Sequence, residues 1–115
     1  MNNFETLQEF VRDGFNVIVE ACTENMPLSD FFDESAYEIA EMERKVNYGI
    51  WDWFQLRVRV SLVGVELGRA TLGSCLYADR ADVLCDGVAD DVIADALDIA
   101  RECATKLRDR LPEAA

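Results

Sequence analysis

The sequence predicts one α+β domain spanning residues 1–115, in which a small antiparallel sheet of three strands packs against α-helices and the chain ends in a long helix. Strict apolar–polar alternation over 54–62 predicts a strand, and an apolar stripe at helical spacing near the C-terminus predicts the final helix. Half of the residues are apolar, which is enough for one hydrophobic core despite a net charge of -12.

Residues 3–13 are predicted to form a helix, because Phe4, Leu7 and Val11 recur at helical spacing between acidic residues. Residues 15–22 allow two structures. The helix can continue to Glu24, but Gly14 interrupts it and three consecutive β-branched residues follow. We favour a strand, and this segment is then the third strand of the sheet. One face of that strand carries Phe15, Val17, Val19 and Ala21.

The middle of the chain predicts a loop and then a second helix. Residues 25–34 contain a proline, several turn-forming residues and two adjacent aromatics, which is typical of a loop or a single helical turn. Ser35 and Glu38 form a capping box, and the helix that they begin runs from 35 to 47. Asn47 and Gly49 end it.

The strand over 54–62 leads into a β-hairpin. We place Gly64 at the first central position of a two-residue type II′ turn. That register sets Val60 opposite Arg69 and breaks the apolar face, so a bulge at Gly68 is needed to restore it. The predicted pairs are then Ala70 with Val60, Leu72 with Val58, and Leu76 with Phe54.

The C-terminal helix has agreeing signals at both ends. Asp86 is placed to cap it, acidic residues occupy its first turn, and Arg108 and Arg110 precede Pro112. Its apolar stripe consists of Ala89, Val92, Ile93, Ala96, Ala100, Cys103, Leu107 and Leu111.

The composition disfavours an enzyme, a metal site and a cofactor. The sequence has no histidine, which is the commonest general base and metal ligand. Its four cysteines are irregularly spaced with no C-x-x-C pair, as expected for free thiols and not for a zinc site. Residues 82–93 resemble a calcium loop, but Leu84 and Ile93 replace required oxygen ligands. We therefore expect no catalytic residue, no metal and no cofactor.

The chain is expected to act in the cytoplasm. Its N-terminus has acidic residues where a secretory signal needs a basic start and an apolar stretch. No run approaches the ~20 apolar residues that span a bilayer. With an isoelectric point near 4.2 the chain is strongly negative at neutral pH, and this charge repels nucleic acid and anionic lipid. We therefore expect neither as a direct partner. A basic protein surface is a suitable partner.

Acidic residues gather on two predicted helix faces. Asp91, Asp95, Asp98 and Glu102 fall within about 60° of one another on the final helix. Glu34, Glu38 and Glu41 line one side of the helix over 35–47. Charge runs are usually solvated surface. The alternative is that these carboxylates imitate phosphates and dock into a groove built for nucleic acid, since i, i+4 carboxylates lie ~6 Å apart along the axis.

Two tryptophans are further candidates for a contact surface. Trp51 and Trp53 share the strand face of Arg57 and Arg59, opposite the core face. We favour coverage by the second helix or stacking by arginine. If they are exposed instead, they join Phe31 and Phe32 as aromatic anchors of the kind that dominate interfaces.

About half of the chain carries a resemblance to known proteins, through the runs Trp53-Phe54, Arg57-Val58, Val60, Gly64-Val65-Glu66-Leu67-Gly68 and Leu72-Gly73, then Cys75, Tyr77 and an acidic helix. This pattern resembles small, uncharacterised accessory proteins of bacteriophages and prophages. The resemblance implies a fold of strand, helix, hairpin and helix. Many phage proteins of this size and acidity, anti-CRISPR inhibitors among them, occupy a nucleic-acid-binding surface of their target.

Together these observations predict a non-catalytic phage inhibitor, similar to anti-CRISPR proteins. It is expected to bind a basic, nucleic-acid-binding surface of a host defence complex, such as a CRISPR effector, by mimicry of DNA. The first alternative is an acidic regulatory or adaptor module of phage that binds protein without mimicry. A small enzyme is the third possibility.

Overall fold

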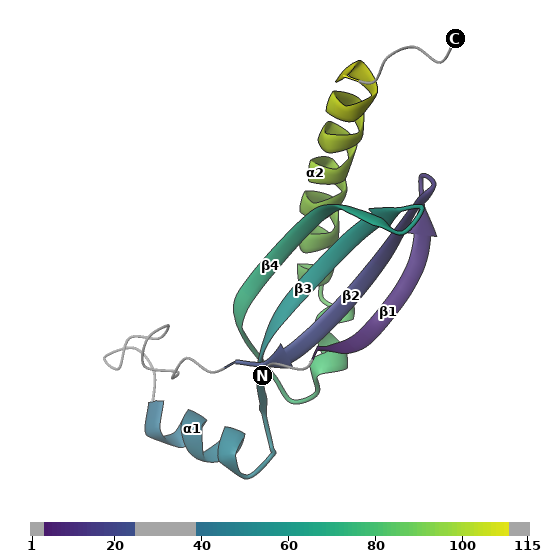
Figure 1. The fold of residues 1–115 in the computed structure, drawn as a ribbon. Coiled ribbons are helices and arrows are strands. Elements are labelled where there is room, and N and C mark those ends of the chain that lie inside the picture. The colour runs from purple at the N-terminus through teal and green to yellow at the C-terminus, as the bar shows by residue number, and fades with distance from the viewer. Residues whose placement is uncertain (1–3, 25–38, 111–115) are drawn as a thin grey trace.

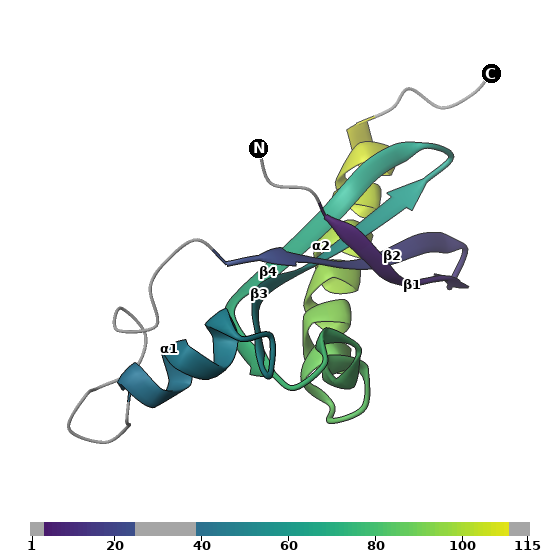
Figure 2. The same cartoon turned by 90° about the horizontal axis from the view of Figure 1, so that it is seen from below.

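The computed structural model describes residues 4–24 and 39–110, which form a four-stranded antiparallel sheet with a long helix across one face (Figures 1 and 2). The strands lie in the order β1-β2-β3-β4, so each pairs with the next one along the chain. The elements are β1 (Glu5–Arg12), β2 (Phe15–Thr23), α1 (Ile39–Asn47), β3 (Asp52–Leu62), β4 (Val65–Tyr77), the 3₁₀ helix η2 (Arg80–Leu84) and α2 (Val88–Arg110).

The α+β class and the long final helix are confirmed, but the helix predicted over 3–13 is wrong. Residues 5–12 form the edge strand β1, and the sheet has four strands where three were expected. The cause is the Asp13-Gly14 pair, whose φ angles of 54° and 85° are the signature of a type I′ hairpin turn. A register shift between Thr6 and Gln8 leaves Leu7 as an extra residue, so the apolar spacing imitates that of a helix.

Residues 15–22 form a strand, as favoured from the sequence. In β2 the alternating residues Phe15, Val17, Val19 and Ala21 are all buried. The helix α1 ends at Asn47 as predicted, and Gly49 follows it with a positive φ of 75°. The predicted loop over 25–34 and the first part of the predicted helix, 35–38, lie outside the described residues.

The strand predicted over 54–62 is confirmed as β3, whose residues Phe54, Leu56, Val58 and Val60 are fully buried. The hairpin that follows turns one residue earlier than predicted. Val63 and Gly64, both with positive φ, are its central residues, and Leu62 pairs with Val65. The turn is therefore of type I′, with Gly64 in the second central position.

A bulge next to Gly68 is confirmed, although the predicted pairs around it are wrong. The register shifts between Val60, which pairs with Gly68, and Ser61, which pairs with Glu66. A second shift lies between Leu56 and Phe54. The pairs that replace the predicted ones are Ala70 with Val58, Leu72 with Leu56, and Cys75 with Phe54.

The helix α2 packs most closely on β4, at Gly68. A Cβ atom built on Gly68 would lie 2.3 Å from the Ala96 carbonyl oxygen and 2.8 Å from the Ala100 nitrogen. Only a glycine in the strand, opposite alanines in the helix, allows this approach. The predicted apolar stripe is buried from Ala89 to Ala100, whereas Leu107 is exposed, and Leu111 lies outside the described residues.

We predict that Gly68→Ala lowers the free energy of unfolding by about 1–3 kcal/mol, because the new methyl group meets helix backbone that has no room to move. Gly73→Ala is the matched control in the same strand. Within the described residues its Cβ would meet the Glu24 carboxylate, at 3.2 Å, which is the far end of a side chain and not backbone. Urea denaturation measures both; equal stabilities of the two variants would contradict the close approach.

Candidate functional site

The four acidic residues predicted on the C-terminal helix lie together on its outer side. The residues of α2 that face the sheet are buried, and Asp91, Asp95, Asp98 and Glu102 project from the opposite side of the same turns, all of them exposed. We call these four residues the acidic ridge. At 1.5 Å per residue it extends for about 16 Å along the helix.

Two members of the acidic ridge pair with bases on the same helix. Asp98 accepts a hydrogen bond from Arg101 at 3.2 Å, and Glu102 lies 3.1 Å from Lys106. The carboxylate side chains remain 75% and 69% exposed. Exposed pairs of this kind contribute little to stability, so a basic partner can replace the intramolecular bases at small cost.

The second predicted acidic face is described only at its end. Glu34 and Glu38 lie outside the described residues. Glu41 lies in the first turn of α1 and pairs with Arg44 one turn later. That hydrogen bond lowers the pKa of the Glu41 carboxyl below its ordinary value.

The two tryptophans differ in their surroundings. Trp53 is 6% exposed because it packs against Ile39, Met42 and Val46 of α1, as favoured from the sequence. Trp51 is half-buried, with the Lys45 ammonium 4.3 Å from its ring centroid. Both indoles border an open hollow of about 450 Å³ between α1 and the end of the sheet. Trp53 therefore offers little contact area, and Phe31 and Phe32 lie outside the described residues.

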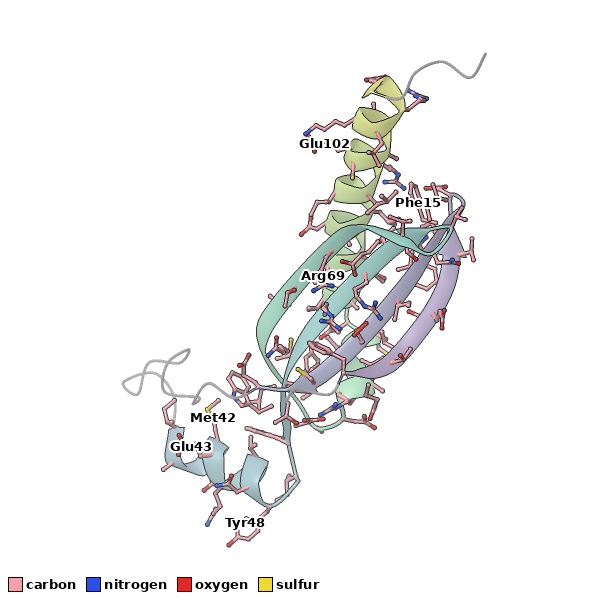
Figure 3. All side chains as sticks on the ribbon, in the orientation of Figure 1. Phe15, Met42, Glu43, Tyr48, Arg69 and Glu102 are labelled. Carbon is pink, nitrogen blue, oxygen red and sulfur yellow. The ribbon has the colours of Figure 1, made fainter. Side chains whose placement is uncertain are left out.

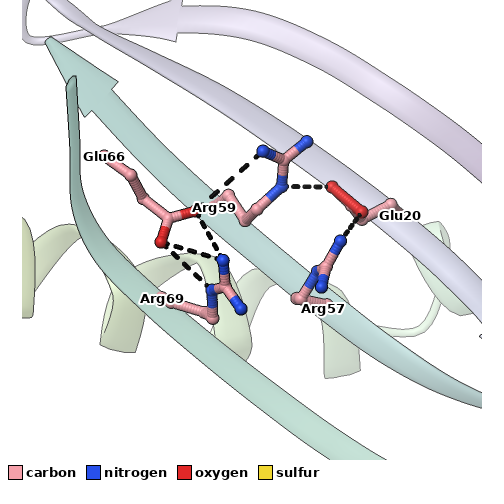
Figure 4. A network of polar contacts seen from close by, with 5 residues as sticks. All are labelled: Glu20, Arg57, Arg59, Glu66 and Arg69. Atoms are coloured by element: carbon pink, nitrogen blue, oxygen red, sulfur yellow. Dashed lines mark hydrogen bonds and ion pairs between the residues drawn. The ribbon is translucent and has the colours of Figure 1, made fainter. Parts of the chain in front are cut away.

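The sheet face away from α2 carries a network of charges that the sequence patterns did not reveal (Figure 4). Glu20 in β2 is 3% exposed and binds two arginines of the neighbouring strand, Arg57 and Arg59, each at 2.5 Å. Glu66 pairs with Arg69 at 3.0 Å and lies 3.9 Å from Arg59. The sequence shows that Arg57 and Arg59 alternate with apolar residues in β3. It does not show which carboxylate they bind, because that depends on the register between β2 and β3.

The ring of Phe4 covers Arg57 at the more buried end of this network. The Arg57 guanidinium carbon lies 3.6 Å from the centroid of the Phe4 ring. The Arg57 Nε atom is buried without a hydrogen-bond partner. The network therefore joins β2 to β3 across the face that α2 leaves uncovered.

A second polar contact fixes the start of α2. The Tyr77 hydroxyl donates a hydrogen bond to Asp86 at 2.5 Å, and the Val88 amide donates to the other Asp86 oxygen at 3.1 Å. These donors lower the pKa of Asp86, the tyrosine first. Burial, and then the hydrogen bond to Asp86, raise the pKa of Tyr77. The predicted capping role of Asp86 is confirmed.

The four thiols are separate from one another. Cys22 and Cys75 are buried, Cys103 is half-buried and Cys85 is exposed. Burial raises the pKa of Cys75 to about 11, so this thiol stays protonated near neutral pH. Within residues 4–24 and 39–110, no three Cys, Asp or Glu side chains are placed to hold a metal ion together.

Comparisons of the chain with protein-family models, curated proteins and solved structures give no match. In the described part of the chain, none of the helices combines the length and the apolar character needed to cross a membrane.

We predict that Glu20→Gln lowers the free energy of unfolding by about 1–3 kcal/mol, since it leaves two arginines without the carboxylate that compensates them. This value is below that of a fully buried pair because Arg57 and Arg59 are partly exposed. Glu9→Gln, an exposed carboxylate on β1, is the control and should change stability by less than about 0.5 kcal/mol. Urea denaturation checks both values. If Glu20→Gln left the free energy of unfolding unchanged, the network would contribute nothing to stability.

We predict that the Asp86 cap makes stability depend on pH in the acid range. Its folded-state pKa is lower than the ordinary 3.8, so its stabilisation is complete well above 3.8 and is lost as the pH falls through the folded-state pKa. Asp86→Asn keeps a hydrogen-bond acceptor but has no charge to lose. The stability difference between parent and variant should shrink between about pH 5 and pH 2.

Urea denaturation across that pH range measures the effect. Asp90→Asn, in the first turn of α2, controls for the general loss of negative charge. A difference between parent and Asp86→Asn that stays constant with pH would refute the assignment.

Proposed function

We propose that this chain is a non-catalytic binding protein whose acidic ridge docks on a basic, nucleic-acid-binding surface of another protein. The observation that carries the proposal is the common outward orientation of the four ridge carboxylates on α2. Their spacing of ~6 Å per turn is on the scale of phosphates along a nucleic-acid strand. Mimicry of DNA by this ridge is the mechanism that we propose.

The distribution of charge supports a basic partner. Like charges one turn apart on a helix repel and cost a few tenths of a kcal/mol each, so the ridge does not help the fold. Residues 70–100 carry seven acids and one base, whereas residues 44–69 carry five bases and two acids. Four of these seven acids lie on α2, all of them exposed, where they attract a positive surface over a distance of about a Debye length.

The resemblance to phage accessory proteins extends the proposal to a biological role. The chain would act in the cytoplasm of a bacterial host as a stoichiometric inhibitor of a defence complex, a CRISPR effector being our first choice. Basic channels that hold guide and target strands are suitable receptors for an acidic ridge.

An adaptor that binds protein without mimicry is the second candidate. It is favoured by the hollow beside Trp51, where an indole is available next to Asp52 and Asp79. In that case the contact would depend on an aromatic side chain, with little dependence on salt.

We predict that combined Asp91→Asn, Asp95→Asn, Asp98→Asn and Glu102→Gln substitutions weaken binding at least 100-fold and leave the fold intact, because no buried residue changes. A matched variant removes four exposed carboxylates outside α2: Glu5→Gln, Glu9→Gln, Glu43→Gln and Asp82→Asn. Both variants have the same net charge, so a difference between them reports the location of the charge.

The measurement is biolayer interferometry against purified CRISPR effector complexes, in a series of salt concentrations and with duplex DNA as competitor. Mimicry predicts steep weakening with salt and displacement by DNA. If the ridge variant binds like the parent and salt has no effect, the acidity serves solubility alone.

A further inference from the structure

The C-terminal part of α2 projects beyond the sheet (Figure 1). Ala100 is the last helix residue fully buried in the core, and Ala104 packs only against the edge of the core. Residues 105–109 are all exposed. Residues 105–109 therefore form a helical segment about 6 Å long that has no cover from the described part of the chain.

Apolar side chains form a row along α2 that leads onto this projecting end. Ile99, Cys103 and Leu107 lie four residues apart and form one ridge along the helix. Ile99 is 47% exposed and Leu107 is 46% exposed. Together with Glu102 and Lys106 they line an open hollow of about 310 Å³. Exposed apolar residues that gather in this way mark an interaction surface.

The charges along α2 indicate what covers the row. The first part of the helix is acidic, with Asp90, Asp91, Asp95 and Asp98, while residues 101–110 carry four bases and two acids. Figure 3 places Glu102 on this projecting part. An antiparallel copy of the same helix would set each basic end beside an acidic segment. The surface is thus complementary to itself along the helix axis.

We propose that this row is the interface of a homodimer, in which two α2 helices cross in antiparallel orientation about a twofold axis near Cys103. Ile99 of one protomer packs beside Leu107 of its partner, and the contact occurs twice, as twofold symmetry requires. Lys106 of one protomer lies beside Glu102 of its partner, within the same charged flank. The proposal does not depend on the function proposed above.

The contact is short, so the dimer is in equilibrium with monomer. A few turns of helix bury less than the usual area of a stable interface. Dimerisation should therefore appear as the protein concentration rises through the range from about 10 µM to about 1 mM.

The first test is sedimentation equilibrium on the full chain over that range. Leu107→Glu places a charge against the partner's Ile99 at both ends of the contact and should raise the dimer dissociation constant at least tenfold. Thr105→Glu adds the same charge in the same turn but on the opposite side of the helix, and should dimerise like the parent. Both residues are exposed, so circular dichroism should show an unchanged fold.

The second test uses the thiols. In Cys85→Ser the remaining accessible thiol is Cys103, because Cys22 and Cys75 are buried. A short bismaleimide should link two such chains efficiently, since the twofold axis brings the two Cys103 side chains together. Cys103→Ser, which keeps the exposed Cys85, should give only the low yield of random collisions.

The dimer is refuted if the parent stays monomeric up to about 1 mM, or if the two glutamate variants have equal dissociation constants. Equal cross-linking through Cys85 and Cys103 would also refute it. These outcomes are distinct from failure of the acidic ridge, because Leu107→Glu retains all four ridge carboxylates.

Discussion

The contact between α2 and β4 at Gly68 is the constraint on which the rest of the fold depends. With the Ala96 carbonyl and the Ala100 amide within van der Waals range of the missing side chain, the helix axis lies as near to the strand as backbone allows. The adjacent bulge turns Gly68 toward the helix, opposite Val60. Because interiors pack at crystal-like density, this distance also determines which side chains fit between helix and sheet.

The two faces of the sheet are stabilised by different interactions. Burial of apolar area holds the α2 face together, whereas the opposite face depends on one carboxylate, Glu20, shared by two arginines. A buried charge without its partner lowers the stability of the fold, so such a network is stable only when every charge is paired. It is therefore specific for the strand register that brings these partners together. It therefore favours the pairing of Glu20 with Arg57 over any slipped β2–β3 register. The Tyr77–Asp86 hydrogen bond fixes the other boundary, between the last strand and the last helix.

The helix α2 combines three surfaces along one element. Its inner side packs on the sheet, its outer side carries the acidic ridge, and the row of Ile99, Cys103 and Leu107 leads onto its projecting end. A helix that served only to cover four strands would need fewer residues than this one has. The extra turns expose apolar side chains to water, and the ridge carboxylates repel one another, so neither feature stabilises the fold. Both are better explained by association with another molecule. The ridge and the row meet at Glu102, which belongs to the ridge and also lines the hollow beside the row.

The sequence by itself determined the elements whose patterns are local. Alternation in β3, the apolar stripe with its Asp86 cap in α2, and the need for a bulge near Gly68 each follow from side-chain periodicity or φ preference within one segment. The outward grouping of the acidic ridge follows from the same helical period. Only the tertiary structure decided that residues 5–12 are a strand, because the Asp13-Gly14 turn and pairing with β2 override a helical spacing. It also decided which carboxylate the β3 arginines bind, since that choice depends on the register between strands distant in sequence.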